Sequence, residues 1–270
     1  MPHILRKTRE YTRRVGNLAL GFLRPWRPGN IAMFHMARSG STVMGDLLDQ
    51  HPSIFWDGEI YSPQRPFLFT RVSRSLISDP MKILQLRIRL AGTSFYGFET
   101  QFYHLDLINI ELPDYIGQLK RLGFDHFILL DRRNHLRIIV SALIGLETDR
   151  WHQKRPTLPR LTQIELATDN VFPPNGLPLK ATLSHFGECF AKLEKLLDDD
   201  QVLRLTYEDD ILEDPLVGYR RVCRFLEVPA HEVTVRYGRT NPFKLKDMII
   251  NFSQVEEALC GTSFEWMLYE

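Results

Sequence analysis

Short apolar runs alternate along the chain with segments that have helical periodicity. Asn30–His35 is a continuously apolar run of the kind found in strands buried on both faces of a parallel sheet. After Gly40 and Ser41, apolar residues at positions 43, 44, 47 and 48 repeat with the spacing of one helix face and predict a helix that ends near Pro52. The pattern of residues 30–52 therefore predicts a strand, a tight loop and a helix.

The same alternation recurs further along the chain. Residues 127–131 predict a second buried strand, followed by a helix with apolar positions 136, 139, 140 and 143. Residues 183–197 predict a helix that leads into a strand at 202–206, and Pro215 opens another helix. Strands and helices in this order are typical of α/β folds. We predict one α/β domain over residues 29–270, with a P-loop-like parallel sheet flanked by helices on both faces.

Two regions fit this alternation poorly and are predicted to be irregular insertions. Residues 60–125 mix aromatic and basic segments around a plausible strand at 95–98, and residues 150–180 contain five prolines, at positions 156, 159, 173, 174 and 178. Irregular segments of this length in a compact domain usually bind or cover a substrate. We expect a substrate to be held there.

The overall composition excludes several classes of protein. The 34 Lys and Arg residues nearly balance the 33 Asp and Glu residues, which argues against bulk nucleic-acid binding. The three cysteines, Cys189, Cys223 and Cys260, are odd in number and widely spaced, so neither a disulfide framework nor a cysteine zinc site is expected. This pattern favours a reducing compartment, and we expect a cytoplasmic protein. There is no HExxH motif, and no metal is expected to be required.

The N-terminal segment departs from this neutral balance. Residues 1–27 contain seven basic residues and one acidic residue, Glu10, and their apolar residues fall on one helical stripe. The apolar run is shorter than the ~20 residues that a membrane span requires. Residues 1–28 are therefore interpreted as a basic amphipathic segment. This segment packs on the domain, attaches to a membrane surface through a basic amphipathic helix, or contacts a partner.

The segment Met36–Thr42, between the first predicted strand and its helix, has the features of an anion site. Ser39, Gly40, Ser41 and Thr42 offer consecutive backbone N–H groups at a helix N-terminus. Arg38 adds a forked donor that suits oxyanions. The GxxxxGK[ST] pattern of ATP-binding P-loops is absent, and the cation precedes the glycine, so ATP with magnesium is not the expected ligand.

The segment Phe34–Pro52 resembles the phosphosulfate loop of sulfotransferases that use 3′-phosphoadenosine 5′-phosphosulfate (PAPS). A second hallmark of that family is a strand ending in Arg with a Ser eight residues later, and Arg133 and Ser141 have that spacing. Leu205–Pro215 is similar to the family's strand, Tyr-Glu-Asp turn and proline-opened helix, and Arg239–Pro242 resembles a late segment that covers the cofactor. The loop is closer to the bacterial and carbohydrate-type branch than to the cytosolic phenol and steroid enzymes.

The resemblance implies transfer of a sulfuryl group from PAPS to an acceptor hydroxyl by in-line displacement, with release of PAP. It implies that the loop holds the 5′-phosphate, that Arg38 reaches the sulfonate, and that Arg133 and Ser141 hold the 3′-phosphate. Arg132 and Arg137 either add charge or pair with nearby acids, and Tyr207 either contacts adenosine or is a core aromatic residue. The implied cofactor-binding residues are Arg38, Ser39, Gly40, Ser41, Thr42, Arg133, Ser141, Tyr207, Arg239 and Thr240.

A base must also remove the proton of the acceptor hydroxyl. Glu59 is the candidate, because many family members have a glutamate shortly after the phosphosulfate-loop helix, and apolar neighbours would raise its pKa. A structural ion pair is the alternative role for Glu59, and His104 or His51 is the alternative base.

The aromatic and basic content of the insertions suits a glycan, glycolipid or other lipid-linked alcohol as the acceptor. The sequence sets no oligomeric state. Two other functions remain open at this point. One is a nucleotide-dependent P-loop kinase, and the other is an inactive nucleotide-binding protein of the same fold.

Overall fold

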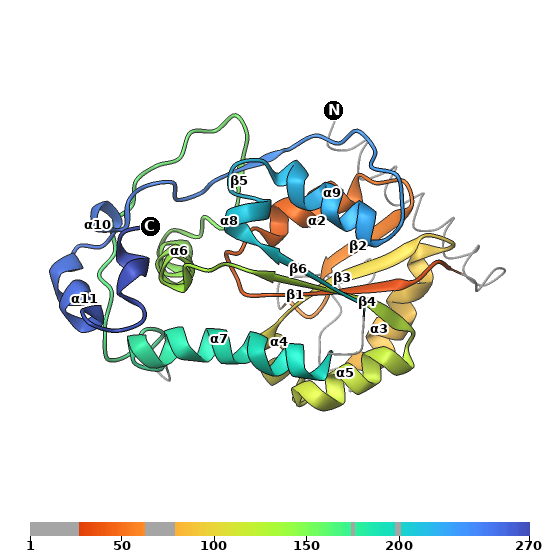
Figure 1. Cartoon of the computed structure of the whole chain (residues 1–270), viewed down its shortest axis with the longest axis horizontal. Coiled ribbons are helices and arrows are strands. Elements are labelled where there is room, and N and C mark those ends of the chain that lie inside the picture. The colour runs from red at the N-terminus through yellow and green to blue at the C-terminus, as the bar shows by residue number, and fades with distance from the viewer. Residues whose placement is uncertain (1–26, 63–78, 174–175, 198–200) are drawn as a thin grey trace.

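Five parallel strands form the sheet at the centre of the computed structural model (Figure 1). The structure describes residues 27–62, 79–173, 176–197 and 201–270. The strand order is β2-β3-β1-β4-β6, so the loop after β1 lies at the middle of the sheet's carboxyl edge. The strands are β1 Asn30–His35, β2 Ile54–Glu59, β3 Phe95–Gln101, β4 Phe124–Asp131 and β6 Gln201–Thr206.

Helices connect the strands and cover both faces of the sheet (Figure 1). Asp79, Asn134 and Asp214 cap α3, α6 and α9 through their side chains. A short antiparallel pair, β5 Gln153–Lys154 and β7 Tyr237–Gly238, joins two distant loops. The helices are α2 Ser41–Asp49, α3 Pro80–Ile88, η2 Arg89–Ala91, α4 Phe102–Ile108, α5 Leu112–Arg121, α6 His135–Thr148, α7 Leu179–Leu196, α8 Tyr207–Asp210, α9 Pro215–Phe225, α10 Leu245–Met248, α11 Phe252–Leu259 and η3 Glu265–Leu268.

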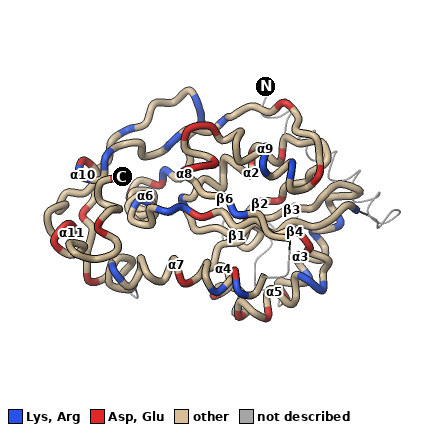
Figure 2. Tube along the Cα trace, in the orientation of Figure 1, with Lys and Arg blue, Asp and Glu red and all other residues tan. Residues whose placement is uncertain are grey.

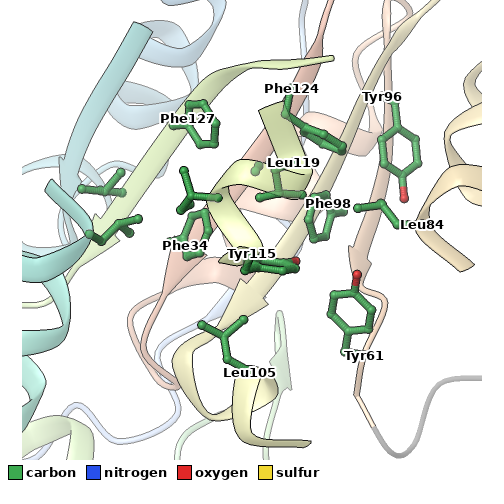
Figure 3. Packing of buried hydrophobic residues seen from close by; sticks show 14 of the residues in the cluster. Phe34, Tyr61, Leu84, Tyr96, Phe98, Leu105, Tyr115, Leu119, Phe124 and Phe127 are labelled. Carbon is green, nitrogen blue, oxygen red and sulfur yellow. The ribbon is translucent and has the colours of Figure 1, made fainter. Parts of the chain in front are cut away.

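Alternate residues of β1 point into two separate cores. Ile31 and Met33 pack toward α2 and α9, whereas Ala32 and Phe34 pack toward α3, α5 and α7. In the second core, Phe34 meets Tyr115 of α5 edge to face, with ring centroids 6.1 Å apart (Figure 3). Because both faces of β1 are covered, its sequence is apolar at consecutive positions.

The predicted fold class is confirmed. The strand at 30–35 has the predicted bounds, and the other predicted strands and helices are present with ends shifted by a few residues. The pattern missed β2, which ends at the candidate base Glu59. It also missed α3, α4 and α5 inside the first insertion. The second insertion has little regular structure, as expected: residues 155–173 contain no helix and one isolated bridge, between Ile164 and Ile249.

The predicted N-terminal segment, residues 1–28, lies outside the described residues except for its last two positions. No helix in the described part of the chain is both long and apolar enough to cross a bilayer. Figure 2 shows acidic and basic residues interspersed along the described part of the trace.

Candidate active site

The loop between β1 and α2 has a conformation that depends on Gly40. Both Arg38 and Gly40 lie in the left-handed region, with φ of 65° and 90°. A Cβ on Gly40 would lie 2.9 Å from the Ile211 side chain and 3.1 Å from the Tyr207 ring. A larger residue at this position would therefore be strained and would push the loop away from Tyr207.

The N-terminus of α2 is left open to an anion. Gly40 is its N-cap, so no side chain caps the first-turn N–H groups, and no acidic residue lies in that turn. By contrast, side chains cap α3, α6 and α9. Val43 N–H bonds back to the Gly40 carbonyl at 3.0 Å, and the positive end of the helix dipole, with the amides before Val43, faces the place where a negative group would bind.

Arg38 connects the loop to two distant segments. Its Nε donates a hydrogen bond to Ser141 Oγ of α6 (2.8 Å), and its terminal nitrogens donate to the Trp151 carbonyl and to the Thr240 hydroxyl. Asn241 also donates to Ser141 Oγ (3.0 Å), so the Ser141 hydroxyl proton remains available to another acceptor. These contacts use three of the five guanidinium N–H donors and leave two.

A cleft lies beside this loop, and we call it the arginine cleft. Five arginines line it, namely Arg38, Arg132, Arg137, Arg155 and Arg239, and its described lining contains no Asp or Glu. Its other lining residues are Gly40, Ser41, Thr42, Val43, Ser141, Trp151, His152, Gln153, Tyr207, Ile211, Leu212, Pro215, Tyr237, Gly238, Thr240, Asn241 and Met248.

Arg38, Arg132 and Arg137 are the more buried of these five arginines, and the desolvation of their charges makes them receptive to an anion. Burial lowers the pKa of Arg132 to about 10. Tyr207 and Glu208 oppose this effect, and the nearby charges of Arg137 and Arg38 add to it. Burial also lowers the pKa of Arg38 and of Arg137, and Arg239 adds to the effect at Arg137. A bound anion would offset the desolvation and the mutual repulsion of these cations.

Eight of the ten sequence-predicted cofactor residues line the arginine cleft, and Ser39 and Arg133 do not. Ser39 is fully buried, and its hydroxyl donates to the Met36 carbonyl, which closes the loop. Arg133 is half exposed and forms a two-pronged ion pair with Asp209, with both N–O distances 2.8 Å. The eight are Arg38, Gly40, Ser41, Thr42, Ser141, Tyr207, Arg239 and Thr240.

Arg132, the neighbour of Arg133, enters the cleft instead. Its guanidinium lies over the Tyr207 ring, 4.4 Å from the centroid, and donates to the Arg38 carbonyl at 3.0 Å. Its buried Nε has no hydrogen-bond partner in the described part of the chain. Arg132 rather than Arg133 is therefore placed to meet an anion in this structure.

A second and larger cleft, of about 1080 Å³, opens on the other side of the loop, and we call it the deep cleft. It shares five lining residues with the arginine cleft: Arg38, Ser41, Thr42, Trp151 and His152. Most of its remaining lining comes from the two insertions and from one face each of α6 and α7. Those residues are Met36, Ala37, Glu59, Ser62, Gln101, Phe102, Tyr103, Leu105, Asp106, Asn109, Ile110, Glu111, Leu112, Ile138, Ala142, Leu146, Phe172, His185, Phe186, Cys189 and Lys192.

Trp151 and His152 stand where the two clefts meet, and nothing in their local sequence marked them individually. His152 Nδ1 lies 3.2 Å from Thr42 Oγ1, and burial, with the charge of Arg38, lowers the pKa of His152. The proline-rich composition of their insertion was the available indication that this region covers a site.

Glu59 is the last residue of β2 and lines the deep cleft. The pairing of β2 with β3 shifts between Trp56 and Glu59, and this shift sets Glu59 opposite Glu99. Gln101 donates to Glu59 Oε1 at 2.7 Å, and Trp56 donates to Glu99 Oε1 at 2.7 Å. The carboxylate of Glu59 is therefore oriented by a neighbouring strand.

The two histidines considered as alternative bases lie in different places. His104 Nε2 is 3.9 Å from Glu59 Oε2. His51 lines neither cleft: its Nδ1 accepts the Ser53 N–H at 3.1 Å, and its Nε2 lies 3.0 Å from the Pro229 carbonyl. The structure thus brings His104, and not His51, to the predicted base.

No protein-family model matches the chain, and no curated protein matches it. Among solved structures, the chain is similar to the sulfotransferase domain from the Synechococcus PCC 7002 olefin synthase. The identity is 15%, the match covers 90% of this chain and 93% of that one, and the TM-score is 0.40. A likeness of this degree assigns neither an activity nor a substrate to this chain.

Proposed function

We propose that the chain is a sulfotransferase that moves a sulfuryl group from PAPS to the hydroxyl of an acceptor and releases PAP. The observation that carries this proposal is the meeting of two unlike clefts at Arg38. One is rich in arginine and free of carboxylates in its described lining, and the other contains a positioned carboxylate, Glu59.

The arginine cleft suits the PAP part of the donor. The uncapped end of α2 and the hydroxyls of Ser41 and Thr42 would bind the 5′-phosphate. Arg132, Ser141 and Arg137 would meet the 3′-phosphate, and Tyr207 the adenosine. This differs from the sequence prediction for Arg133, which the structure pairs with Asp209.

The residues where the arginine cleft and the deep cleft meet suit sulfuryl transfer. The acceptor oxygen forms a bond to sulfur while the bond from sulfur to the 5′-phosphate oxygen breaks, and the electron pair of that bond stays on the phosphate. Two N–H donors of Arg38 are left to stabilise this growing negative charge. The acceptor proton passes to the Glu59 carboxylate across the deep cleft.

The deep cleft favours an acceptor that is partly apolar. Much of its wall is aliphatic or aromatic, as at Phe102, Leu105, Ile138, Leu146 and Phe186, and its volume of about 1080 Å³ is at the upper end of ligand pockets. We therefore narrow the predicted acceptor to an amphipathic alcohol, such as a glycolipid, whose apolar part lies along this wall.

Calorimetry with PAP and with ATP plus magnesium tests the donor. PAP is expected to bind with an affinity at least about tenfold higher than that of ATP, because the arginines can neutralise two separated phosphates while the loop lacks a P-loop lysine. Binding of ATP without binding of PAP would contradict the sulfotransferase proposal and favour a nucleotide-dependent kinase.

Alkyl glucosides of increasing chain length test the acceptor, because they keep one hydroxylated head group. With labelled PAPS, kcat/KM is expected to rise at least about tenfold from methyl to octyl glucoside, since full burial of each CH₂ contributes about 0.8 kcal/mol. Leu146→Glu should reduce this gain, because Leu146 lines the deep cleft. Leu158→Glu, at an exposed leucine outside that cleft, is the matched control and should preserve it. A rate that does not change with chain length would argue against an apolar acceptor.

A further inference from the structure

His35 occupies an unusual position at the end of β1, next to the loop. The ring is fully buried, and its Nδ1 lies 2.9 Å from the Met36 carbonyl, which can only accept a hydrogen bond. Nδ1 must therefore carry a proton. The other nitrogen, Nε2, lies 3.4 Å from Glu99 Oε2 and 3.8 Å from Glu59 Oε1.

The order of the strands creates this cluster. His35, Glu59 and Glu99 lie at or near the carboxyl ends of β1, β2 and β3, which are neighbours in the sheet. Their polar atoms fall within 4.8 Å of one another, although the residues are up to 64 positions apart in the sequence. One side of the cluster is buried, and the Glu59 side opens to the deep cleft.

The protonation of His35 follows from this geometry. If the ring were neutral, with its proton on Nδ1, the Nε2 lone pair would face two carboxylates, and the ring itself is out of reach of water. Two carboxylates and a lone pair repel one another strongly at this depth. A second proton, on Nε2, turns the two repulsions between the ring and the carboxylates into attractions and places a positive charge beside both carboxylates.

The other groups that face the cluster are His104, His152 and Arg38. His104 Nδ1 accepts the Gln101 N–H at 3.1 Å, so in its neutral form this ring directs an N–H toward Glu59. On the cleft side, His152 feels the negative charge of Glu99, but burial and Arg38 lower its pKa. Arg38 itself is bound to Ser141, Trp151 and Thr240.

We propose that His35 is an imidazolium that holds the Glu59 carboxylate in place and ionised, and so acts as a positioning residue for the base. This inference rests on the proposed function of Glu59. His35 has no contact with the deep cleft, so it acts through Glu59 and not on the acceptor. Glu99 shares the charge of His35 and is fixed in turn by Trp56.

The titration of His35 is consistent with this role. Burial alone lowers the pKa of His35, but the proximity of Glu99 and then of Glu59 outweighs it, and the net pKa is raised. A group whose folded pKa is raised stabilises the fold below its unfolded pKa, and this contribution is lost as the pH rises through the folded value. The wild-type protein should therefore lose stability above neutral pH, and His35→Gln should lose less.

The first test observes the wild-type ring directly. An NMR titration of the histidine ring protons, assigned by comparison with His35→Gln, is expected to show that His35 titrates above its ordinary value of about 6.5. A His35 signal that titrates below that value, or that stays neutral at pH 6, would overturn the proposal. So would a stoichiometric divalent metal in the purified wild-type protein that is missing from His35→Gln.

The second test measures the pH dependence of turnover. In His35→Gln the acid limb of kcat against pH is expected to move up by at least about one unit, because the Glu59 carboxylate loses its neighbouring cation. PAP affinity should stay within about twofold, since His35 lines neither cleft. An unchanged acid limb with reduced kcat would overturn the positioning role.

His126→Gln is the matched control. His126 is a mostly buried β4 histidine beside Asp125 (2.8 Å), and it lines neither cleft, so its replacement should leave the acid limb in place. Failure of the proposed function would appear separately, as loss of PAP binding or transfer in the wild type. The NMR titration of His35 depends neither on PAP binding nor on sulfuryl transfer.

Discussion

Replacing Glu59 with glutamine is expected to lower kcat by ~10²-fold or more, which is the scale of general-base catalysis, and to leave PAP affinity nearly unchanged. Glutamine keeps the size of the side chain and can still contact Gln101, but it cannot take the acceptor proton. Glu59 lines the deep cleft and not the arginine cleft, so binding of the donor should be insensitive to the change.

The measurement is steady-state transfer from labelled PAPS, with PAP affinity from calorimetry. Glu111→Gln is the matched control, because Glu111 also lines the deep cleft but has no contact with His35 or Gln101 in the described structure. Its kcat should stay within about threefold, since Glu111 is exposed and its carboxylate is not held beside His35 and Gln101 as that of Glu59 is. Unchanged turnover of Glu59→Gln would move the base to His104, which is 3.9 Å away.

Replacing Arg132 with methionine is expected to weaken PAP binding by about 10- to 100-fold, which corresponds to the 1.5–3 kcal/mol typical of hydrogen bonds to charged groups. Arg132 is buried in the cleft, its Nε has no hydrogen-bond partner within the described residues, and burial already lowers its pKa to about 10. Adenosine 5′-phosphosulfate lacks the 3′-phosphate, so its affinity should fall much less.

Arg133→Met is the control that separates the two neighbouring arginines. Because Arg133 is half exposed and already paired with Asp209, its loss should change PAP affinity by less than about threefold. If Arg133→Met lowers the affinity for PAP as much as Arg132→Met does, the result would mean that Arg133 leaves Asp209 and contacts PAP when PAP binds. The spacing of Arg133 and Ser141 in the sequence would then have identified the 3′-phosphate contact correctly.

Much of the fold could be predicted because local patterns report local structure. The apolar run Asn30–His35 reflects a strand covered on both faces, and Pro215 after Asp214 marks the start of α9. The strand β2 was missed because the second half of Ile54–Glu59 consists of an aspartate, a glycine and a glutamate, which break the apolar pattern. Asp57 is nevertheless buried, since Arg87 donates to both of its carboxylate oxygens at 2.5 Å.

The candidate site was only partly predictable. The Met36–Thr42 loop is contiguous, so its amides, hydroxyls and Arg38 could be recognised together. The choice between Arg132 and Arg133 could not be made from spacing, because adjacent residues at the end of a strand point in different directions. Trp151 and His152 lie in an irregular segment whose course depends on contacts with Arg38 and Thr42.

The sequence by itself determined the α/β class, the main elements outside the first insertion other than β2, and the make-up of the Met36–Thr42 loop, because each depends on residues that are neighbours along the chain. Only the tertiary structure decided that five arginines share one cleft and that His35 lies close to both Glu59 and Glu99. These residues come from separate elements, and their proximity follows from the strand order β2-β3-β1-β4-β6 and from the packing of distant loops. Charges that balance over the whole chain can therefore be concentrated at one point, where burial strengthens their interaction.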